Sequence, residues 1–391
     1  MDTQNTFVHI RQWNSHFWLL VLANILFTIS VYGLVPFVPL KMEASGYTHD
    51  AIGLAFAAFG IGIFLTGPMV SYLIERFRRN HVCIVSILAY IVLSVLLYKV
   101  EAQETISLGL VGIGVARLLQ GLCYGLTEMV VYSTLVLDTC ESLYRTEASH
   151  TLSWFSRFSL ALGPLFSLLV AHFWDISFVP YFSIGCAALA AIFIYMIPIP
   201  FRSPNEVVTP WSLDRFFLPR SVPLMANVVA FCIVFGLLLA LPLNISFFVW
   251  MLPGFLLALV AEKYVFANAN LKSEAVTALF LLLLVFLLLL TRDYQWISSY
   301  IAAMIGFSLG LLGSRFLLFF IKLSQHCQRG TVQSSFFLSW EIGIWLGIFL
   351  GYTLFNRNIQ AITICGLILI AAALLYYNFV LHPWYVIHRN R

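Results

Sequence analysis

Twelve apolar segments, each about as long as a membrane-spanning helix, follow one another along this 391-residue chain. A helix needs about 20 mainly apolar residues to cross the hydrocarbon core of a bilayer. The predicted spans are 17–40, 51–73, 82–99, 106–132, 148–172, 178–198, 221–241, 244–261, 275–291, 297–321, 334–355 and 359–380. Only 10% of the residues are charged, whereas soluble domains carry about 25%. We therefore predict an all-α integral membrane protein with twelve transmembrane helices.

Basic residues are distributed unevenly between the two sides of this layout. On one side the connections contain only these: Lys41, Lys99, Arg292 and Arg357. Three arginines lie within spans: Arg117, Arg157 and Arg315. Every other Lys and Arg falls on the second side. Because the number of spans is even, both chain ends lie on that side too. Because cytoplasmic loops carry the excess of basic residues, we expect both termini in the cytoplasm and a multi-pass protein of the cell inner membrane.

A polar stretch from Arg202 to Arg220 separates the first six spans from the last six. We predict an N-terminal six-helix bundle over residues 1–200, a cytoplasmic linker over 201–220 and a C-terminal six-helix bundle over 221–391. Similar short sequences follow equivalent spans, since 75–77 reads Glu-Arg-Phe and 262–264 reads Glu-Lys-Tyr. Such repetition favours a duplicated six-helix unit, as in many secondary transporters.

The connection after the second span resembles a loop signature of the major facilitator superfamily, Gly-x-x-x-Asp-Arg-x-Gly-Arg. Here Glu75, Arg76 and Arg79 keep the acidic and basic positions, while Ser71 and Arg78 replace the glycines. In that family these charges hold the cytoplasmic helix ends together. The resemblance implies a gating role for them, with Asp138 at the end of the fourth span as a partner. Ordinary positive-inside topology is the alternative explanation.

The fourth span contains Arg117-Leu-Leu-Gln-Gly121, which matches an Arg-x-x-Gln-Gly pattern of the same family. An arginine inside a membrane costs several kcal/mol unless it faces water or a partner. Helical spacing places Arg117, Tyr124 and Glu128 on one face. The resemblance implies a cavity-facing arginine that binds substrate or takes part in coupling. The alternative is a structural arginine held by a backbone carbonyl.

The fifth span carries Gly163-Pro164, which resembles the centre of a signature of the family's bacterial exporters; the other glycines of that signature are replaced. A proline within a helix predicts a bend. Spans one and seven line the central cavity in the family. The resemblance therefore makes further residues candidates for a substrate cavity, beside Arg117 and Tyr124: Asn24, Tyr32 and Asn227. Arg315 together with Arg117 favours an anionic substrate, and the many aromatic residues favour a lipophilic one.

Two glutamates and two arginines are expected at similar depth in the membrane. Glu128 and Arg157 lie on adjacent spans of the first half, and Arg315 and Glu341 on adjacent spans of the second. We predict one Glu–Arg pair in each half. Either both pairs are buried ion pairs with a purely structural role, or one glutamate takes up a proton and releases its arginine. Glu341 is the preferred carrier, because the eleventh helix lies at the moving interface in the family.

These features predict a secondary active transporter that moves a small molecule by alternating access, with proton-coupled efflux preferred to proton-coupled uptake. A membrane-embedded lipid-modifying enzyme is a weaker alternative, because no catalytic cluster is evident; we expect no enzymatic activity. The sequence lacks a Gly-x-x-x-x-Gly-Lys loop and any Cys/His spacing typical of metal sites, so we expect no cofactor and no metal. The net charge of +4 is dispersed, which gives no sign of nucleic-acid binding. The expected partners are the substrate, protons and lipid, and we expect a monomer.

Overall fold

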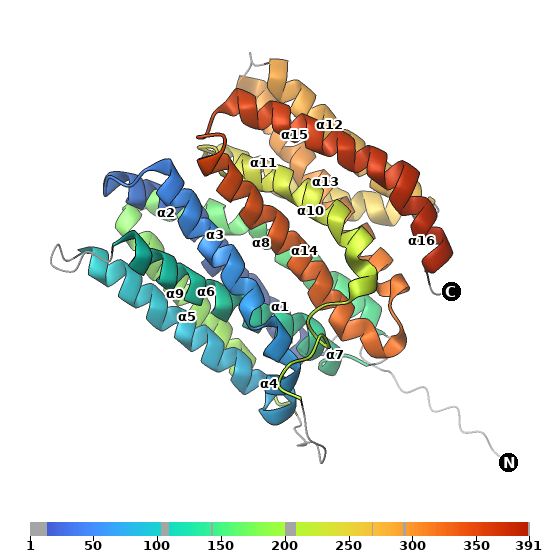
Figure 1. Ribbon diagram of the computed structural model, residues 1–391, viewed down its shortest axis with the longest axis horizontal. Helices are drawn as coiled ribbons and strands as arrows, with labels where there is room; N and C mark the ends of the chain where they lie inside the picture. The colour runs from blue at the N-terminus through green and yellow to red at the C-terminus, as the bar shows by residue number, and fades with distance from the viewer. Residues whose placement is uncertain are drawn as a thin grey trace.

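The computed structural model describes residues 14–102, 109–141, 144–199, 209–267, 269–291 and 295–389. Every regular element in these ranges is a helix, and twelve helical segments among them are long and apolar enough to cross a membrane (Figure 1). The predicted fold class is therefore confirmed. Part of the predicted linker, residues 201–208, and the loop residue Arg292 lie outside the described residues.

The described residues of the N-terminal half, which ends with α9, form these helices: α1 (Ser15–Tyr32), α2 (Leu34–Ala44), α3 (His49–Leu65), η1 (Gly67–Met69), α4 (Val70–Arg76), α5 (Arg79–Ala102), α6 (Leu110–Val130), η2 (Val131–Leu135), α7 (Val136–Asp138), α8 (Arg145–Phe173), η4 (Ile176–Phe178) and α9 (Val179–Tyr195). The segment η2 is π-helical and continues α6 into α7 without a break in the chain.

The C-terminal half, from η5 onward, forms these helices: η5 (Pro219–Ser221), α10 (Val222–Leu239), α11 (Ile245–Tyr264), α12 (Leu271–Thr291), α13 (Gln295–Leu323), η6 (His326–Gln328), α14 (Arg329–Thr353), α15 (Ile359–Tyr376), η7 (Tyr377–Leu381) and α16 (His382–His388). Several helices are longer than the sequence predicts. The ninth span begins at Leu271 and so includes Glu274, and the last continues to His388.

Side-chain caps determine where several spans begin. The side chains of Asn14, Thr48, Asn244 and Asn358 each accept a hydrogen bond from a backbone N–H in the first turn of the following helix. The first N–H groups of a helix have no partner within it, and such residues supply one. These caps are polar residues at the edges of the apolar runs, which is why the span starts were readable from the sequence.

Equivalent spans pack in the same pairs in the two halves. In the N-terminal half α1 packs against α8 and α3 against α6; in the C-terminal half α10 packs against α14 and α11 against α13. The α3–α6 contact depends on small residues, because a Cβ atom at Gly121 would lie 2.0 Å from the carbonyl oxygen of Phe59. Small residues of this kind let membrane helices approach closely.

The two halves meet along α3 and α14 on one side and along α8 with α11 and α13 on the other. In Figure 1, α4, α7 and α16 lie toward the lower right and α2 toward the upper left. We name the first of these the basic end, because Arg79, Arg145, Arg215, Arg329 and Arg389 line cavities there. The other is the opposite end, where α2 ends and α15 begins.

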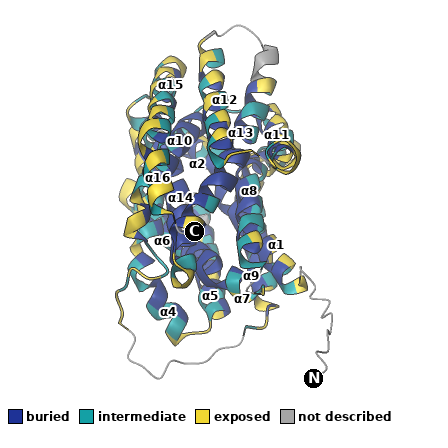
Figure 2. Ribbon diagram, turned by 90° about the vertical axis from the view of Figure 1, so that its right-hand side faces the viewer, coloured by how far each residue is buried: buried dark blue, intermediate teal, exposed yellow. Residues whose placement is uncertain are grey.

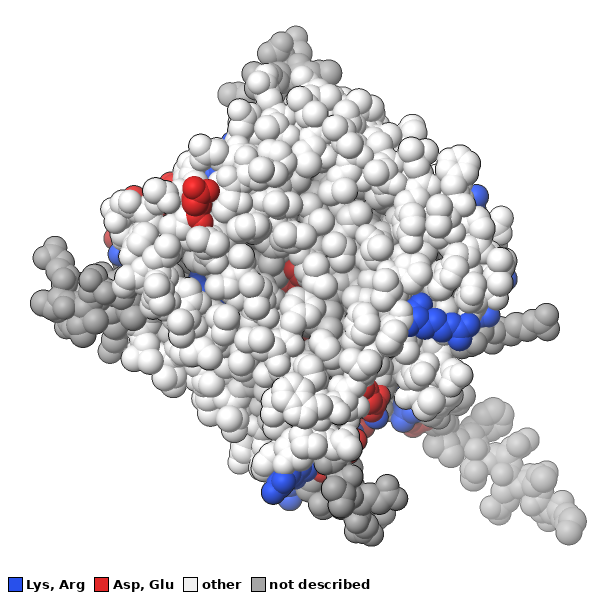
Figure 3. Space-filling model, viewed as in Figure 1, with Lys and Arg blue, Asp and Glu red and all other residues white. Residues whose placement is uncertain are grey.

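Apolar side chains cover the outside of the bundle between its ends. On the face in Figure 3, charged side chains lie mostly toward the ends, and most of the surface between them is uncharged. Figure 2 shows buried residues concentrated along α8, α10 and α13, with exposed ones on the outer faces of α12, α15 and α16. Many of the exposed residues are large and apolar, such as Val111, Ile368 and Phe379. This distribution suits contact with lipid.

Candidate functional site

The carboxylate of Glu341 lies between the two halves and accepts hydrogen bonds from three side chains. Tyr32 Oη donates to its two oxygens at 3.2 and 3.0 Å, and Tyr124 Oη donates to Oε1 at 3.3 Å. Trp345 Nε1 donates to Oε2 at 2.7 Å, one turn further along α14. The two tyrosines belong to α1 and α6, so Glu341 joins the N-terminal half to α14 through its own carboxylate.

Aromatic rings enclose this carboxylate. The ring of Trp345 lies 4.5 Å from that of Phe59, 5.6 Å from that of Tyr32 and 5.9 Å from that of Phe56, measured between centroids. Glu341 is only 4% exposed. No Lys, Arg or His in the described part of the chain lies within ion-pair distance of it. A buried carboxylate with donors but no cationic partner is costly, and such groups inside membranes are usually functional.

A second buried glutamate, Glu128, lies one turn along α6 from Tyr124. With its amide nitrogen facing the carboxylate, Asn24 of α1 donates to both Glu128 oxygens at 2.8 Å. Both residues are buried, Glu128 completely. Arg157, its expected partner, is not within ion-pair distance. The Arg157 guanidinium lies instead over the rings of Phe336 and Trp340, at 5.8 and 5.7 Å, and donates to Ser153 Oγ at 2.5 Å.

Arg157 and Glu341 both line a cavity of about 20 Å³. This is room for about one water molecule. The guanidinium of Arg157 also fits closely against α13, since a Cβ atom at Gly313 would lie 2.1 Å from Arg157 Nε. An arginine of α8 is thus held against α13 and α14, which belong to the other half. It crosses the interface between halves but contacts rings rather than an acid.

Arg117 is buried between α6 and α3. It donates to Gln120 Oε1 at 3.1 Å, and Gln120 in turn donates to Ser94 Oγ at 3.0 Å. Its guanidinium lies 5.9 and 6.0 Å from the ring centroids of Phe56 and Phe59. No backbone carbonyl in the described residues accepts from it, and its Nε and Nη2 atoms have no hydrogen-bond partner there. The alternative, an arginine held by a backbone carbonyl, is therefore not observed for Arg117 in the described residues.

The second predicted Glu–Arg pair is also wrong. Arg315 forms an ion pair with Glu274 of α12, not with Glu341. The physical reason is that α12 begins earlier than predicted, which brings the fully buried Glu274 beside α13. Asn227, predicted to line a central cavity, donates to the carbonyl oxygen of Ala373 at 2.8 Å and so links α10 to α15. Arg315 and Asn227 thus lie within the C-terminal half, apart from the Glu341 cluster.

We expect Glu274→Gln to destabilise the protein strongly while Glu274→Leu combined with Arg315→Met does not. Removal of one member of a buried ion pair leaves an unpaired charge and costs about 3–5 kcal/mol, whereas apolar replacement of both is often neutral. The measurement is the unfolding free energy of each variant in detergent micelles. Equal stability of Glu274→Gln and the wild type would contradict the assignment of Glu274 as the counter-charge of Arg315.

At the basic end, Arg79 forms an ion pair with Asp138, which links α5 to the end of the fourth span as the sequence predicted. Among the described residues, Glu75 and Arg76 make no hydrogen bond or ion pair with another span. Glu75 accepts from Ser71 at 3.2 Å, and Arg76 donates to Tyr72 at 2.5 Å, both within the same segment.

A link between the halves at the basic end comes from the chain between them. Arg215 donates from its backbone N–H to Thr331 Oγ1 at 3.0 Å and from Nη1 to the carbonyl oxygen of Ser133 at 3.1 Å. Its backbone has φ of 59°, a conformation with no clear sequence signal for an arginine. His150 of α8 and Glu262 of α11 lie 3.2 Å apart and add a second contact between halves.

The opposite end is also bridged. Arg357, just before α15, forms an ion pair with Glu43 of α2 at 2.7 Å and donates to the carbonyl oxygen of Ala240 at 3.1 Å. His49 and Asn356 make a further contact between the halves. Both ends of the interface are therefore held by polar contacts, with the Glu341 cluster between them.

The predicted bend at Gly163-Pro164 stays a prediction, because α8 is one uninterrupted helix from Arg145 to Phe173. The structure shows a different use of Gly163. A Cβ atom there would lie 3.0 Å from the backbone nitrogen of Gly33, the residue between α1 and α2, and 3.0 Å from Tyr32 Cβ. Gly163 therefore lets α8 approach the chain beside Tyr32.

The fold agrees with comparisons to known proteins. A family model described as Major Facilitator Superfamily matches residues 20–348. The chain belongs to the Major Facilitator Superfamily. The fold is similar to that of the human organic anion transporter MFSD10 (TETRAN), with a TM-score of 0.70, 14% identity and coverage of 93% of this chain and 100% of that chain. It is also similar to a D-xylose-proton symporter, with a TM-score of 0.67, 16% identity and coverage of 93% and 97%. A comparison with curated protein sequences finds no match.

As a member of this superfamily, the protein is a multi-pass membrane protein of a transporter family. Of the predicted site residues, the structure brings Tyr32, Tyr124 and Glu341 into direct contact, and Asn24 with Glu128 beside them. Trp345 was not among the predicted site residues, although its position four residues after Glu341 places it on the same helix face. Glu274 was missed because it precedes the apolar run, and Arg215 because nothing in its sequence marks it.

Proposed function

We propose that the protein is a secondary active transporter that carries a small molecule across the membrane by alternating access, coupled to protons through Glu341. The observation that carries this proposal is the hydrogen bonding of one buried carboxylate to both halves. Tyr32 and Tyr124 donate from the N-terminal half, and Trp345 from the carboxylate's own helix. Separation of α1 and α6 from α14 breaks the first two bonds and leaves Glu341 facing the new opening.

Proton uptake follows from this change of surroundings. Hydrogen bonds donated to a carboxylate favour its ionised form, and removal from water favours its protonated form. When the halves part, Glu341 loses the tyrosine donors and gains water. When they close again, it re-forms the donor cluster. A carboxylate whose surroundings alternate in this way binds a proton on one side of the membrane and releases it on the other.

Arg117 is the proposed substrate-contacting cation. Two of its guanidinium nitrogens have no partner among the described residues, and the rings of Phe56 and Phe59 lie beside it. These donors suit a substrate with an anionic or strongly accepting group. The coupled direction we propose is efflux, with uptake by symport as the alternative that the experiment below distinguishes.

We propose the cytoplasm as the location of the basic end and of both termini, by the positive-inside rule. We also propose that the protein is a monomer of the inner membrane and has no enzymatic activity. Its partners are protons, the substrate and lipid. Arg79, Asp138 and Arg215 would then form the cytoplasmic gate, and Arg357 with Glu43 the outer one. The contacts that join the halves must open in turn during each transport cycle: those of Arg215 with Thr331 and Ser133 at one end, and that of Arg357 with Glu43 at the other.

The test uses the purified protein in lipid vesicles with an acidic interior. Cleavage by a protease at residues 209–214, most of which are exposed, determines which way each molecule is inserted. A panel of organic anions, sugars and lipophilic cations is supplied outside. For molecules with the basic end outward, an antiporter accumulates its substrate inside as protons leave, whereas a symporter drives it out. Transport that is unaffected by collapse of the pH gradient, for every substrate found, would overturn proton coupling.

A further inference from the structure

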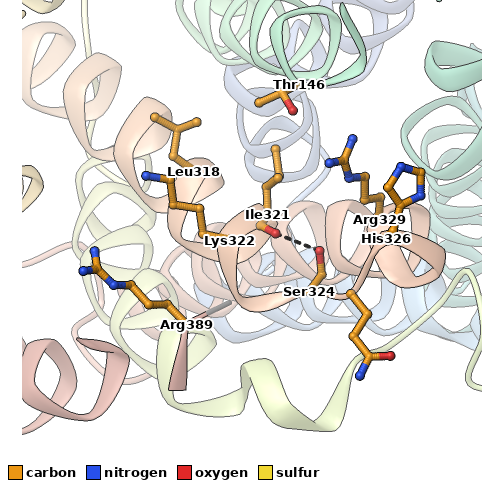
Figure 4. A pocket seen from close by; sticks show the side chains of 9 residues that line it. Thr146, Leu318, Ile321, Lys322, Ser324, His326, Arg329 and Arg389 are labelled. Atoms are coloured by element: carbon orange, nitrogen blue, oxygen red, sulfur yellow. Dashed lines mark hydrogen bonds between the residues drawn. The ribbon is translucent and has the colours of Figure 1, made fainter. Parts of the chain in front are cut away.

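A cavity of about 750 Å³ lies at the basic end, where α13 ends and α14 begins. Figure 4 shows Arg329 and His326 on one side of it and Lys322 and Arg389 on the other. None of the described residues that line this cavity is acidic. Leu318 and Ile321 give part of its wall an apolar surface. A volume of this size is typical of sites for small organic ligands.

A second cavity, of about 270 Å³, adjoins the first and shares Arg329 and His326 with it. Its wall adds three arginines from other parts of the chain: Arg79, Arg145 and Arg215. Its only acidic lining residue, Asp138, is already paired with Arg79. Arg215 lies 3.4 Å from Asp214 of its own loop.

Arg145 and Arg329 have no such counter-charge. No carboxylate of the described residues lies within ion-pair distance of either. Arg145 Nε is buried and has no hydrogen-bond partner there. A buried donor without a partner costs about 1–3 kcal/mol, so an acceptor bound in the cavity would stabilise Arg145.

The helices that carry these two arginines strengthen the positive potential. Arg145 is the first residue of α8 and Arg329 the first of α14, and both helices are long, with 29 and 25 residues. A helix N-terminus carries a partial positive charge and favours an anion nearby. A cation at that position is unfavourable unless an anion compensates for it. The first turn of α8 contains the exposed Glu147, whereas the first turn of α14 contains no acidic residue.

We propose that the two adjoining cavities bind an organic phosphate, with the phosphate group between Arg145 and Arg329 and the rest of the molecule against Leu318 and Ile321. Two unpaired guanidinium groups and two helix N-termini suit a group with more than one negative charge and several acceptor oxygens. The source is either a phospholipid headgroup or a soluble phosphorylated molecule. This inference does not depend on the role of Glu341.

Occupancy of this site has a conformational consequence. Arg145 belongs to the N-terminal half, Arg329 to the C-terminal half, and Arg215 to the chain between them. A phosphate that contacts both arginines holds the halves together at the basic end. It therefore favours the conformation that is closed at this end. The size of this effect is set by the difference between the ligand's affinities for the closed and open conformations.

The experiment measures the thermal midpoint of the full-length protein in an uncharged detergent. One arm titrates inorganic pyrophosphate at constant ionic strength, and the other adds phosphatidylglycerol against the same amount of phosphatidylcholine. The test variant is Arg145→Gln/Arg329→Gln. Its charge-matched control is Arg78→Gln/Lys263→Gln, which removes two exposed cations that line neither cavity.

We expect the wild type and the control to be stabilised, and the test variant to bind at least about tenfold more weakly. Stabilisation by pyrophosphate would show that the ligand is a soluble phosphorylated molecule. Stabilisation only by phosphatidylglycerol would show that it is a phospholipid headgroup. If the test variant is poorly folded, Arg145→Lys/Arg329→Lys, which keeps the charge, should bind with intermediate affinity. No stabilisation of the wild type in either arm, or equal stabilisation of the test variant and the control, would overturn the site.

Discussion

Replacement of Glu341 by Gln should abolish proton-driven accumulation of substrate while leaving exchange of substrate across the membrane intact. Gln keeps the size of the side chain and retains an oxygen that accepts from Tyr32 and Trp345, but it cannot bind and release a proton. The alternating movement of the halves needs no proton once substrate is bound on both sides. We expect accumulation under a pH gradient to fall at least about tenfold, with exchange within about twofold of the wild type.

Glu128→Gln is the matched control, because Glu128 is equally buried and lies close by on α6. It should keep accumulation, since Asn24 holds it within the N-terminal half and no hydrogen bond or ion pair joins it to α14 in the described residues. The reverse result, normal accumulation by Glu341→Gln and loss in Glu128→Gln, would make Glu128 the carrier. Normal accumulation in both variants would show that neither glutamate couples transport to protons.

Arg117→Ala should reduce the transport rate below about a tenth of the wild-type value with little change in thermal stability, because two charge-assisted hydrogen bonds to the substrate are lost. Among the described residues, the guanidinium makes one hydrogen bond, to Gln120, and it lies beside the rings of Phe56 and Phe59. Its removal therefore costs the fold little and leaves the substrate without its cation.

Arg117→Lys separates the contribution of charge from that of shape. A lysine restores the positive charge but not the planar group that lies beside both rings and offers several donors. We expect little rescue of transport by Lys. The measurement is initial uptake into vesicles, with the thermal midpoint as the control for folding. Near-normal transport by Arg117→Ala would assign the residue a structural role instead.

The sequence was sufficient for the membrane-spanning layout, because that layout depends on local properties. The length of each apolar run matches the thickness of a bilayer, and polar caps such as Thr48 and Asn244 mark where helices begin. The Arg79–Asp138 contact was also predictable, because the resemblance of the loop after the second span to the family signature implied Asp138 as a partner. Family motifs added the superfamily, which the match over residues 20–348 confirms.

The partners of the buried charges were decided by tertiary structure alone. The chain positions of Glu128, Arg157, Arg315 and Glu341 favoured two pairs between neighbouring spans, and neither pair forms. Periodicity predicts which face of a helix a residue occupies, but not how far each helix is rotated or shifted along its neighbour. Such offsets depend on tertiary packing, for example the close contact of Gly121 with Phe59 between α6 and α3. The contact of α1 with α14 across the interface places Tyr32 beside Glu341, and the earlier start of α12 places Glu274 beside Arg315.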